Sequence, residues 1–165
     1  MRVSVRGSDK FRRDVDNALQ ILSTTRQFED NFLKVVKCVR QSKRSRHFAS
    51  AALSPGRGKI NIRETDSISK ETLVLVLAHE AFHNVLYHEY IERWGWLYPR
   101  HHYMLDFFSV ERRCIKHEIA IAKELNFQPD VVNTCEVYLR ILLHPSLLHE
   151  QVRIIRSLRK GLHEP

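Results

Sequence analysis

Apolar residues recur at helical spacing through the first 43 residues of the chain. One set repeats every three or four positions and comprises Phe11, Val15, Leu19 and Leu22. A second set follows and comprises Phe28, Phe32, Val35, Val36 and Val39. Because this period places apolar side chains on one helix face, the pattern predicts two amphipathic helices hinged at 23–25. Ser8 is placed to cap the start of the first helix.

The period changes in the next part of the chain. Segments 47–53 and 59–63 flank a Ser-Pro-Gly-Arg-Gly sequence at 54–58, which has the composition of a turn. Ile60 and Ile62 alternate with polar residues, as in a half-buried strand. The two segments therefore predict a β-hairpin, and its second strand is expected to be able to bind an extended peptide.

A continuous apolar run marks the next helix. Residues 72–78 are almost entirely apolar, and residues 66–69 offer N-caps before them. A helix that is apolar on every side is a buried one. The pattern predicts that this helix continues to about Arg93, and that further helices span 101–125, 130–143 and 145–161.

The fold class that follows is α+β and mostly helical. A single domain is predicted over 1–165, with a helical N-terminal part at 1–43, a core at 47–125 and C-terminal helices at 130–160. The small β-hairpin or sheet is expected to pack on the buried helix, since that helix has no polar face to turn to solvent.

The buried helix ends in a sequence with metal chemistry, His79-Glu80-Ala81-Phe82-His83. Residues four apart share a helix face, so His79 and His83 can bind one zinc ion together. Glu80 lies about 100° round the helix, where it can reach a water on the metal and act as general base. Burying these polar groups without a shared partner would be costly, which favours a metal over a pair of core histidines.

The order of elements over 47–125, together with this HExxH motif, resembles the zincin metallopeptidases. The likeness is greatest to the small gluzincins, in which a glutamate on the helix after the motif supplies the third ligand. The resemblance implies a zincin-like fold, one zinc ion, hydrolysis of peptide bonds and a protein or peptide substrate.

The third zinc ligand is predicted from the helix at 101–125. Its apolar face is marked by Met104, Phe108, Ile115 and Ala122. At about 100° per residue, Glu111 falls at the centre of that face and Glu118 on its margin. A core-facing carboxylate needs a partner, so Glu111 is the predicted ligand and Glu118 an alternative. An ion pair between Glu111 and a nearby arginine is the competing interpretation.

Gluzincins often carry an aspartate four residues after the ligand glutamate, where it orients a histidine. That position here is Ile115, so the residue that orients a histidine must come from elsewhere.

Two further histidines leave an alternative open. His101 and His102 follow His83 by 18 and 19 residues. SprT-like proteins take a third histidine ligand from about this distance, so either residue is a candidate ligand. Either histidine, Tyr103 or Tyr98 is also a candidate donor to the oxyanion of the reaction. The competing interpretation is that both histidines lie on the surface at a helix start.

Composition adds alternatives for partners and place. The net charge is +8, with basic clusters at 34–46 and 153–160. Such charge suits nucleic acid or anionic lipid, although neither cluster carries interleaved aromatics that stack on bases. A nucleic-acid-associated protease and a non-catalytic zincin-fold binding protein are therefore the alternative functions. The three cysteines are scattered and odd in number, which suits a reducing compartment.

Targeting signals and the C-terminus complete the sequence predictions. The chain has no secretory signal, and its longest apolar run is too short to cross a bilayer, so a cytoplasmic protein without membrane contact is predicted. Residues 161–165 contain possible metal ligands and are a candidate latency segment over the site. The competing interpretation is that the C-terminal helices only pack on the domain.

Overall fold

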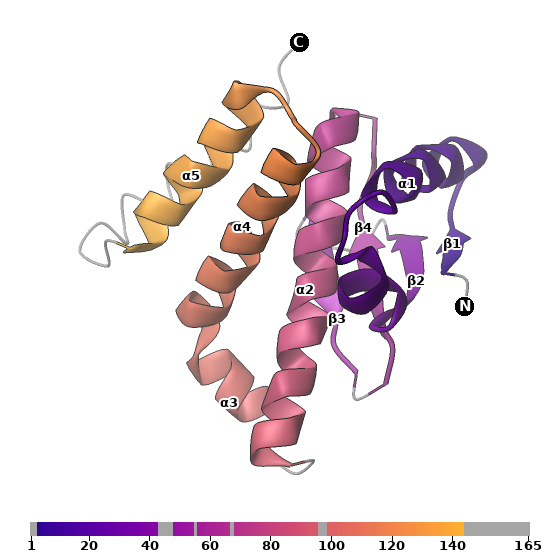
Figure 1. Ribbon diagram of the computed structural model, residues 1–165. Helices are drawn as coiled ribbons and strands as arrows, with labels where there is room; N and C mark the ends of the chain where they lie inside the picture. Colours follow the sequence, from indigo (N-terminus) through magenta and orange to yellow (C-terminus); the bar gives the residue numbers. More distant parts are fainter. Residues whose placement is uncertain (1–2, 43–47, 55, 67, 96–98, 144–165) are drawn as a thin grey trace.

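The computed structural model describes residues 3–42, 48–54, 56–66, 68–95 and 99–143 (Figure 1). The strands are β1 (Ser4–Arg6), β2 (Val36–Gln41), β3 (Ala49–Ala52) and β4 (Gly58–Ile62). The helices are α1 (Asp9–Leu22), the short π-helix η1 (Glu29–Leu33), α2 (Lys70–Trp94), α3 (Pro99–Leu105), α4 (Phe107–Glu124) and α5 (Pro129–Leu143). The fold is α+β and mostly helical, as predicted. The predicted helix at 145–161 and the tail at 161–165 lie outside the described residues.

The four strands form one sheet in the order β1-β2-β4-β3. β2 pairs in parallel with both β1 and β4, whereas β3 pairs antiparallel with β4. The predicted hairpin is therefore confirmed as β3–β4. The expectation that its second strand binds a peptide is wrong, because β4 is paired on both sides and β3 is the edge strand.

The second predicted N-terminal helix is wrong. The segment forms η1 and then β2, which lies between β1 and β4. A bulge between Val36 and Cys38 shifts the register of β2 by one residue. The bulge places Val36 and Val39 on the same buried face although they are three residues apart. Helical spacing in the sequence thus arose from a bulged strand, in which β-branched valines pack well.

Helix α2 begins and ends where the sequence predicts. The Ser69 hydroxyl accepts a hydrogen bond from the Thr72 backbone N–H, and Gly95 follows the last turn with a φ of 71°. Its apolar half is buried, against α1 and the sheet on one side and against α4 on the other (Figure 1). In the part of the chain that the structure describes, no helix has both the length and the apolarity to cross a membrane.

A close approach of β4 to α2 fixes the sheet over the helix. The Asn84 side chain of α2 is fully buried and lies against Gly58, the first residue of β4. A Cβ atom at position 58 would lie 1.8 Å from Asn84 Oδ1, so any larger residue would require the Asn84 side chain to move. The contact lies one turn beyond Glu80, whose backbone oxygen accepts a hydrogen bond from the Asn84 amide over 3.2 Å.

The helix predicted over 101–125 is two helices, α3 and α4, separated at Asp106. The Tyr90 hydroxyl of α2 donates a hydrogen bond to the Asp106 carboxylate over 2.6 Å. Two residues predicted to face the core are exposed, Met104 at 57% and Phe108 at 47%. The break turns α3 against the C-terminal part of α2, where Tyr103 is buried, and the buried residues of α4 begin at Val110.

Candidate metal centre

Helix α2 aims the two motif histidines at one point. His79 Nε2 lies 3.0 Å from His83 Nε2, and the two rings meet edge to face with centroids 4.8 Å apart. Both side chains are largely buried, at 16% and 10% exposed. The prediction that these residues share a face deep in the domain is therefore confirmed.

Glu111 of α4 faces the same pair of nitrogens. Its Oε1 lies 3.2 Å from His83 Nε2 and its Oε2 lies 3.5 Å from His79 Nε2. Ligands on a tetrahedral zinc ion at bond lengths of 2.0–2.1 Å stand about 3.3 Å apart. The three separations here bracket that value, so the residues present fit zinc, and the predicted third ligand lies beside the predicted pair.

The charges around these donors favour a cation. Burial alone would raise the pKa of Glu111, but its contacts with His79 and His83 outweigh burial and hold that pKa well below its usual range. Burial alone would lower the pKa of His79, yet the carboxylates of Glu118 and Glu111 raise it well above its ordinary value. Carboxylates that favour the positively charged form of His79 produce a negative electrostatic potential, and that potential also attracts a metal cation.

Each histidine is also held at its outer ring nitrogen. Glu118 Oε1 lies 3.0 Å from His79 Nδ1, an ion-pair contact in which Nδ1 makes no linear hydrogen bond. The Tyr103 hydroxyl lies 2.5 Å from His83 Nδ1 and donates a hydrogen bond to the His83 backbone oxygen over 3.5 Å. In the tautomer with the proton on Nδ1, that N–H donates to the Tyr103 oxygen, and the lone pair of Nε2 is available to a metal.

Two of the sequence expectations change in this light. Glu118, an alternative ligand by sequence, contacts the outer nitrogen of His79 and so supplies the missing orienting carboxylate. Tyr103, a candidate oxyanion donor, is only 3% exposed and its hydroxyl is engaged with His83. Both residues therefore contact the ring nitrogens of the histidines that face away from the convergence with Glu111.

The other candidate residues from the sequence are His102, His101 and Tyr98. The His102 ring stacks on the Trp94 ring with centroids 4.2 Å apart, away from the convergence of His79, His83 and Glu111. The side chain of His101 and all of Tyr98 lie outside the described residues.

Glu80 lies between α2 and the edge strand. Its carboxylate interacts with the backbone of Ala51 in β3, as a hydrogen-bond acceptor. It also lies within the electrostatic influence of His79 and His83. Burial raises the pKa of its carboxyl, and the two histidines lower it by less. A carboxylate of raised basicity beside the two histidines suits a general base.

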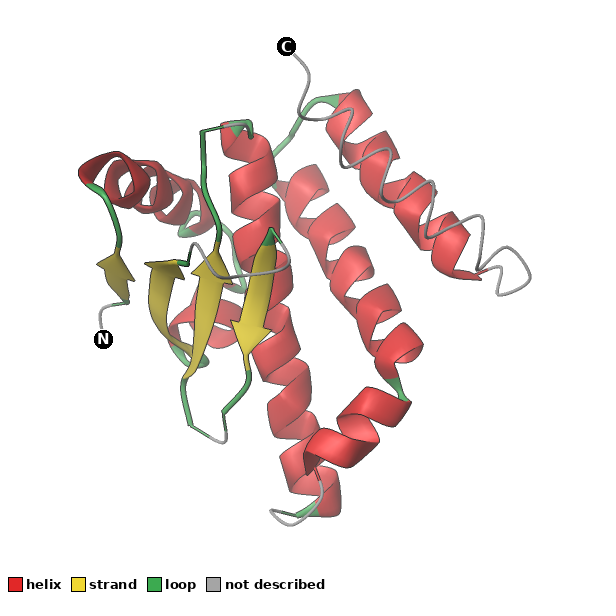
Figure 2. Cartoon of the chain, turned by 180° about the vertical axis from the view of Figure 1, so that it is seen from behind, coloured by secondary structure: helices red, strands yellow, loops and turns green. Residues whose placement is uncertain are grey.

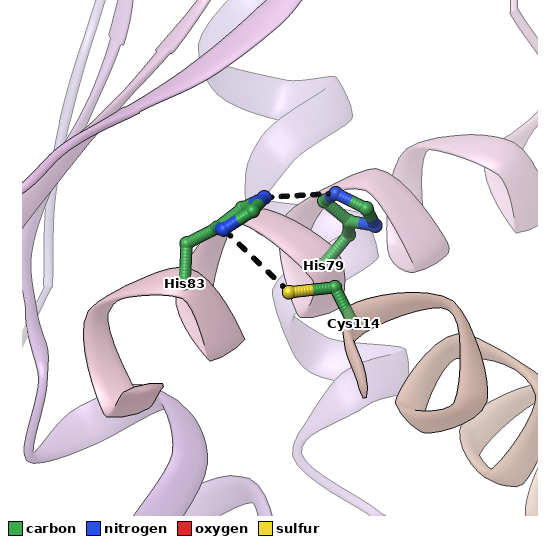
Figure 3. Close-up of side chains that lie close together, drawn as sticks. All are labelled: His79, His83 and Cys114. Atoms are coloured by element: carbon green, nitrogen blue, oxygen red, sulfur yellow. Dashed lines mark hydrogen bonds between the residues drawn. The ribbon is translucent and has the colours of Figure 1, made fainter. Parts of the chain in front are cut away.

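Cys114 is a site residue that the sequence analysis missed. Its Sγ lies 3.6 Å from His83 Nδ1, and the donors of His79, His83 and Cys114 lie within 4.8 Å of one another (Figure 3). Two imidazoles and a thiolate also suit zinc. Cys114 stands three residues after Glu111, so both share one face of α4, and this spacing is the signal that could have revealed it.

The two possible ligand sets differ in which nitrogen of His83 they use. Figure 3 shows His79 and Cys114 each contacting a different nitrogen of the His83 ring, which are Nε2 for His79 and Nδ1 for Cys114. Tyr103 already contacts that nitrogen, whereas Nε2 faces both His79 and Glu111. Burial, with added repulsion from Glu111, raises the pKa of the Cys114 thiol and keeps it neutral. The geometry favours Glu111 as the ligand and Cys114 as part of the wall.

Replacing Tyr103 with phenylalanine is expected to weaken zinc binding about 10- to 100-fold, the usual effect of losing an outer partner of a ligating histidine. The ring would stay in place while the hydroxyl that holds His83 Nδ1 is lost. Zinc affinity measured by competition with a chromophoric chelator checks this. Tyr87→Phe is the matched control, because that ring packs edge to face on Tyr103, whereas among the described tyrosines the hydroxyl that contacts His83 is that of Tyr103. Equal affinities in both variants would contradict the positioning role.

Three separate helices supply the candidate metal centre. The histidine nitrogens come from α2, the carboxylates of Glu111 and Glu118 from α4, and the Tyr103 hydroxyl from α3. Their convergence is the main structural feature of this site. Comparison of the chain with protein-family models, with curated proteins and with solved structures found no match in any of the three.

Proposed function

We propose that this protein is a zinc-dependent peptidase of the zincin type, in which His79, His83 and Glu111 hold the metal and Glu80 is the general base. The observation that carries the proposal is the convergence of three donor residues at separations of 3.0–3.5 Å, next to a carboxylate that is not a donor of this set. The Nδ1 atom of each histidine contacts a second polar side chain, Glu118 for His79 and Tyr103 for His83, as is usual for histidines that bind a metal.

Zinc bound at this site would lower the pKa of a coordinated water toward neutrality and polarise a carbonyl oxygen. Glu80 accepts the proton of the attacking water, because burial has made its carboxyl more basic than usual. It then returns that proton to the nitrogen of the leaving amine, so that one residue serves as base and then as acid. Glu118 and Tyr103 keep the imidazoles in place throughout.

The edge strand β3 supports a peptide as substrate. An edge strand presents unpaired backbone groups, and an extended peptide can add to it as a further strand. β3 lies alongside α2 with Ala51 next to Glu80, so a peptide paired with β3 would pass close to the base (Figure 2). This arrangement favours peptide-bond hydrolysis over other hydrolytic reactions.

The test is cleavage of a pool of quenched fluorescent peptides by the purified protein with zinc. We expect cleavage to stop when a chelator removes the metal and to return when zinc is restored. A protein that binds one equivalent of zinc but cleaves no peptide would support a non-catalytic binding protein with this fold. A protein that binds no zinc would contradict the site itself.

A further inference from the structure

The sheet has one face packed on helices and one that no described helix covers. Val39, Ile60 and Ile62 point into the core that α1 and α2 share. Figure 2 looks onto the other face, with α1 and α2 behind the strands. Because side chains alternate along a strand, the neighbours of those buried residues lie on this uncovered face.

Three exposed basic residues stand on the uncovered face: Arg6 of β1, Arg40 of β2 and Lys59 of β4. The register sets Arg6 beside Arg40 and Arg40 beside Asn61, and Lys59 is two residues before Asn61 on the same strand. None of the four strands contains an aspartate or a glutamate. The three basic residues together are named the basic sheet face.

No described acidic side chain neutralises the charges of the basic sheet face. Other described lysines and arginines form ion pairs, namely Lys10, Arg12, Lys34, Arg113 and Lys123. For Arg6, Arg40 and Lys59, no ion pair is found among the residues that the structure describes.

Two arginines in register on neighbouring strands repel each other. Their backbones stand about 4.8 Å apart, and like charges at such positions destabilise a sheet. The Asn61 amide oxygen accepts a hydrogen bond from Arg40 Nε over 2.5 Å, which orients the guanidinium and leaves its terminal nitrogens available. An array of closely spaced anions would turn this repulsion into attraction.

We propose that the basic sheet face docks the phosphate backbone of duplex nucleic acid. The remaining outward residues of the strands are small or polar, namely Ser4, Ser50, Ala52 and Asn61, with Cys38 buried. Without an aromatic side chain the face has no platform for stacking unpaired bases. Without a large apolar side chain it has nothing to insert into a lipid headgroup layer. The face can therefore contact phosphates only, and such contacts are sufficient for binding a duplex without reading its sequence. The net charge of +8 attracts the nucleic acid to the protein.

This inference is independent of the peptidase proposal. The basic sheet face points away from α2, which carries the metal ligands, and docking needs no metal. Loss of zinc or of hydrolysis would therefore leave duplex binding unchanged, and the two proposals can fail separately.

The test is fluorescence anisotropy of a labelled duplex of about 20 base pairs with the full chain, titrated between 50 and 200 mM salt. Three phosphate contacts predict a slope of log affinity against log salt near −2.7, which is about a 40-fold loss over that range. Arg40→Gln combined with Lys59→Gln is expected to make the slope shallower by about 1.8.

The matched control combines Lys70→Gln with Lys116→Gln, two exposed lysines on α2 and α4 that remove the same charge away from the sheet. It is expected to keep the slope of the natural protein, and thermal melts establish that both double variants are folded. Equal slopes for the two double variants would overturn the proposal, as would no duplex binding at 50 mM salt. Binding of anionic lipid vesicles that depends on Arg40 and Lys59, without duplex binding, would overturn it in favour of a membrane surface.

Discussion

Glu80→Gln is expected to bind zinc as tightly as the natural protein and to lose peptide hydrolysis by about 100- to 10,000-fold. The amide has the size of the carboxylate, and its oxygen can still accept the interaction from the Ala51 backbone. It cannot take a proton from water, so the chemical step loses its base while the donors His79, His83 and Glu111 are untouched. Zinc content and kcat/KM on one cleaved peptide are the two measurements.

Glu92→Gln is the control for this experiment, because it makes the same change on an exposed position of the same helix. It is expected to leave both zinc content and hydrolysis unchanged. More than a tenth of the natural activity in Glu80→Gln would rule out Glu80 as the base. Loss of zinc from Glu80→Gln would instead make Glu80 part of the ligand set.

Glu111→Ala is expected to weaken zinc binding by more than about 100-fold, beyond the usual effect of an outer partner. Two histidine nitrogens 3.0 Å apart would remain, without the carboxylate that now bridges them. Cys114→Ser is the matched variant, since it alters the other possible donor three residues along the same helix face. It is expected to keep zinc within a few-fold of the natural affinity, as measured by competition with a chromophoric chelator.

The opposite result would identify the other ligand set. Zinc kept by Glu111→Ala and lost by Cys114→Ser would assign the metal to His79, His83 and Cys114. Zinc kept at full affinity by both variants would contradict both sets. His83 is a member of both ligand sets, so His83→Ala is expected to lose zinc and hydrolysis together. This variant is the positive control for loss of the metal.

The parts of the site that were predicted from sequence depend on local geometry. A continuous apolar run and a capping serine at Ser69 indicate α2, and helical periodicity then places His79, Glu80 and His83 along it. Glu111 was predicted because a carboxylate in a core-facing stripe needs a partner, and the structure places it beside both histidines. These inferences use only neighbours within a few turns of one helix, which the sequence encodes directly.

The orienting residues could not be predicted in the same way. Tyr103 reaches His83 because the chain breaks at Asp106 and α3 packs against α2, an arrangement that depends on a contact with Tyr90. Glu118 lies two turns beyond Glu111 and meets His79 only because α4 runs alongside α2 (Figure 1). Both assignments depend on how separate helices pack, which periodicity does not report.

The sequence by itself determined that α2 is a buried helix carrying two histidines and a carboxylate on known faces, and that a hairpin precedes it. Only the tertiary structure decided that Val36 and Val39 belong to a strand, because a bulge in a sheet and a turn of helix can space apolar residues alike. It also decided that β3 rather than β4 is an edge strand of the described sheet, since strand pairing joins segments distant in the chain. Hydrophobic period is a local property, whereas strand order and helix contacts are settled by which surfaces bury one another.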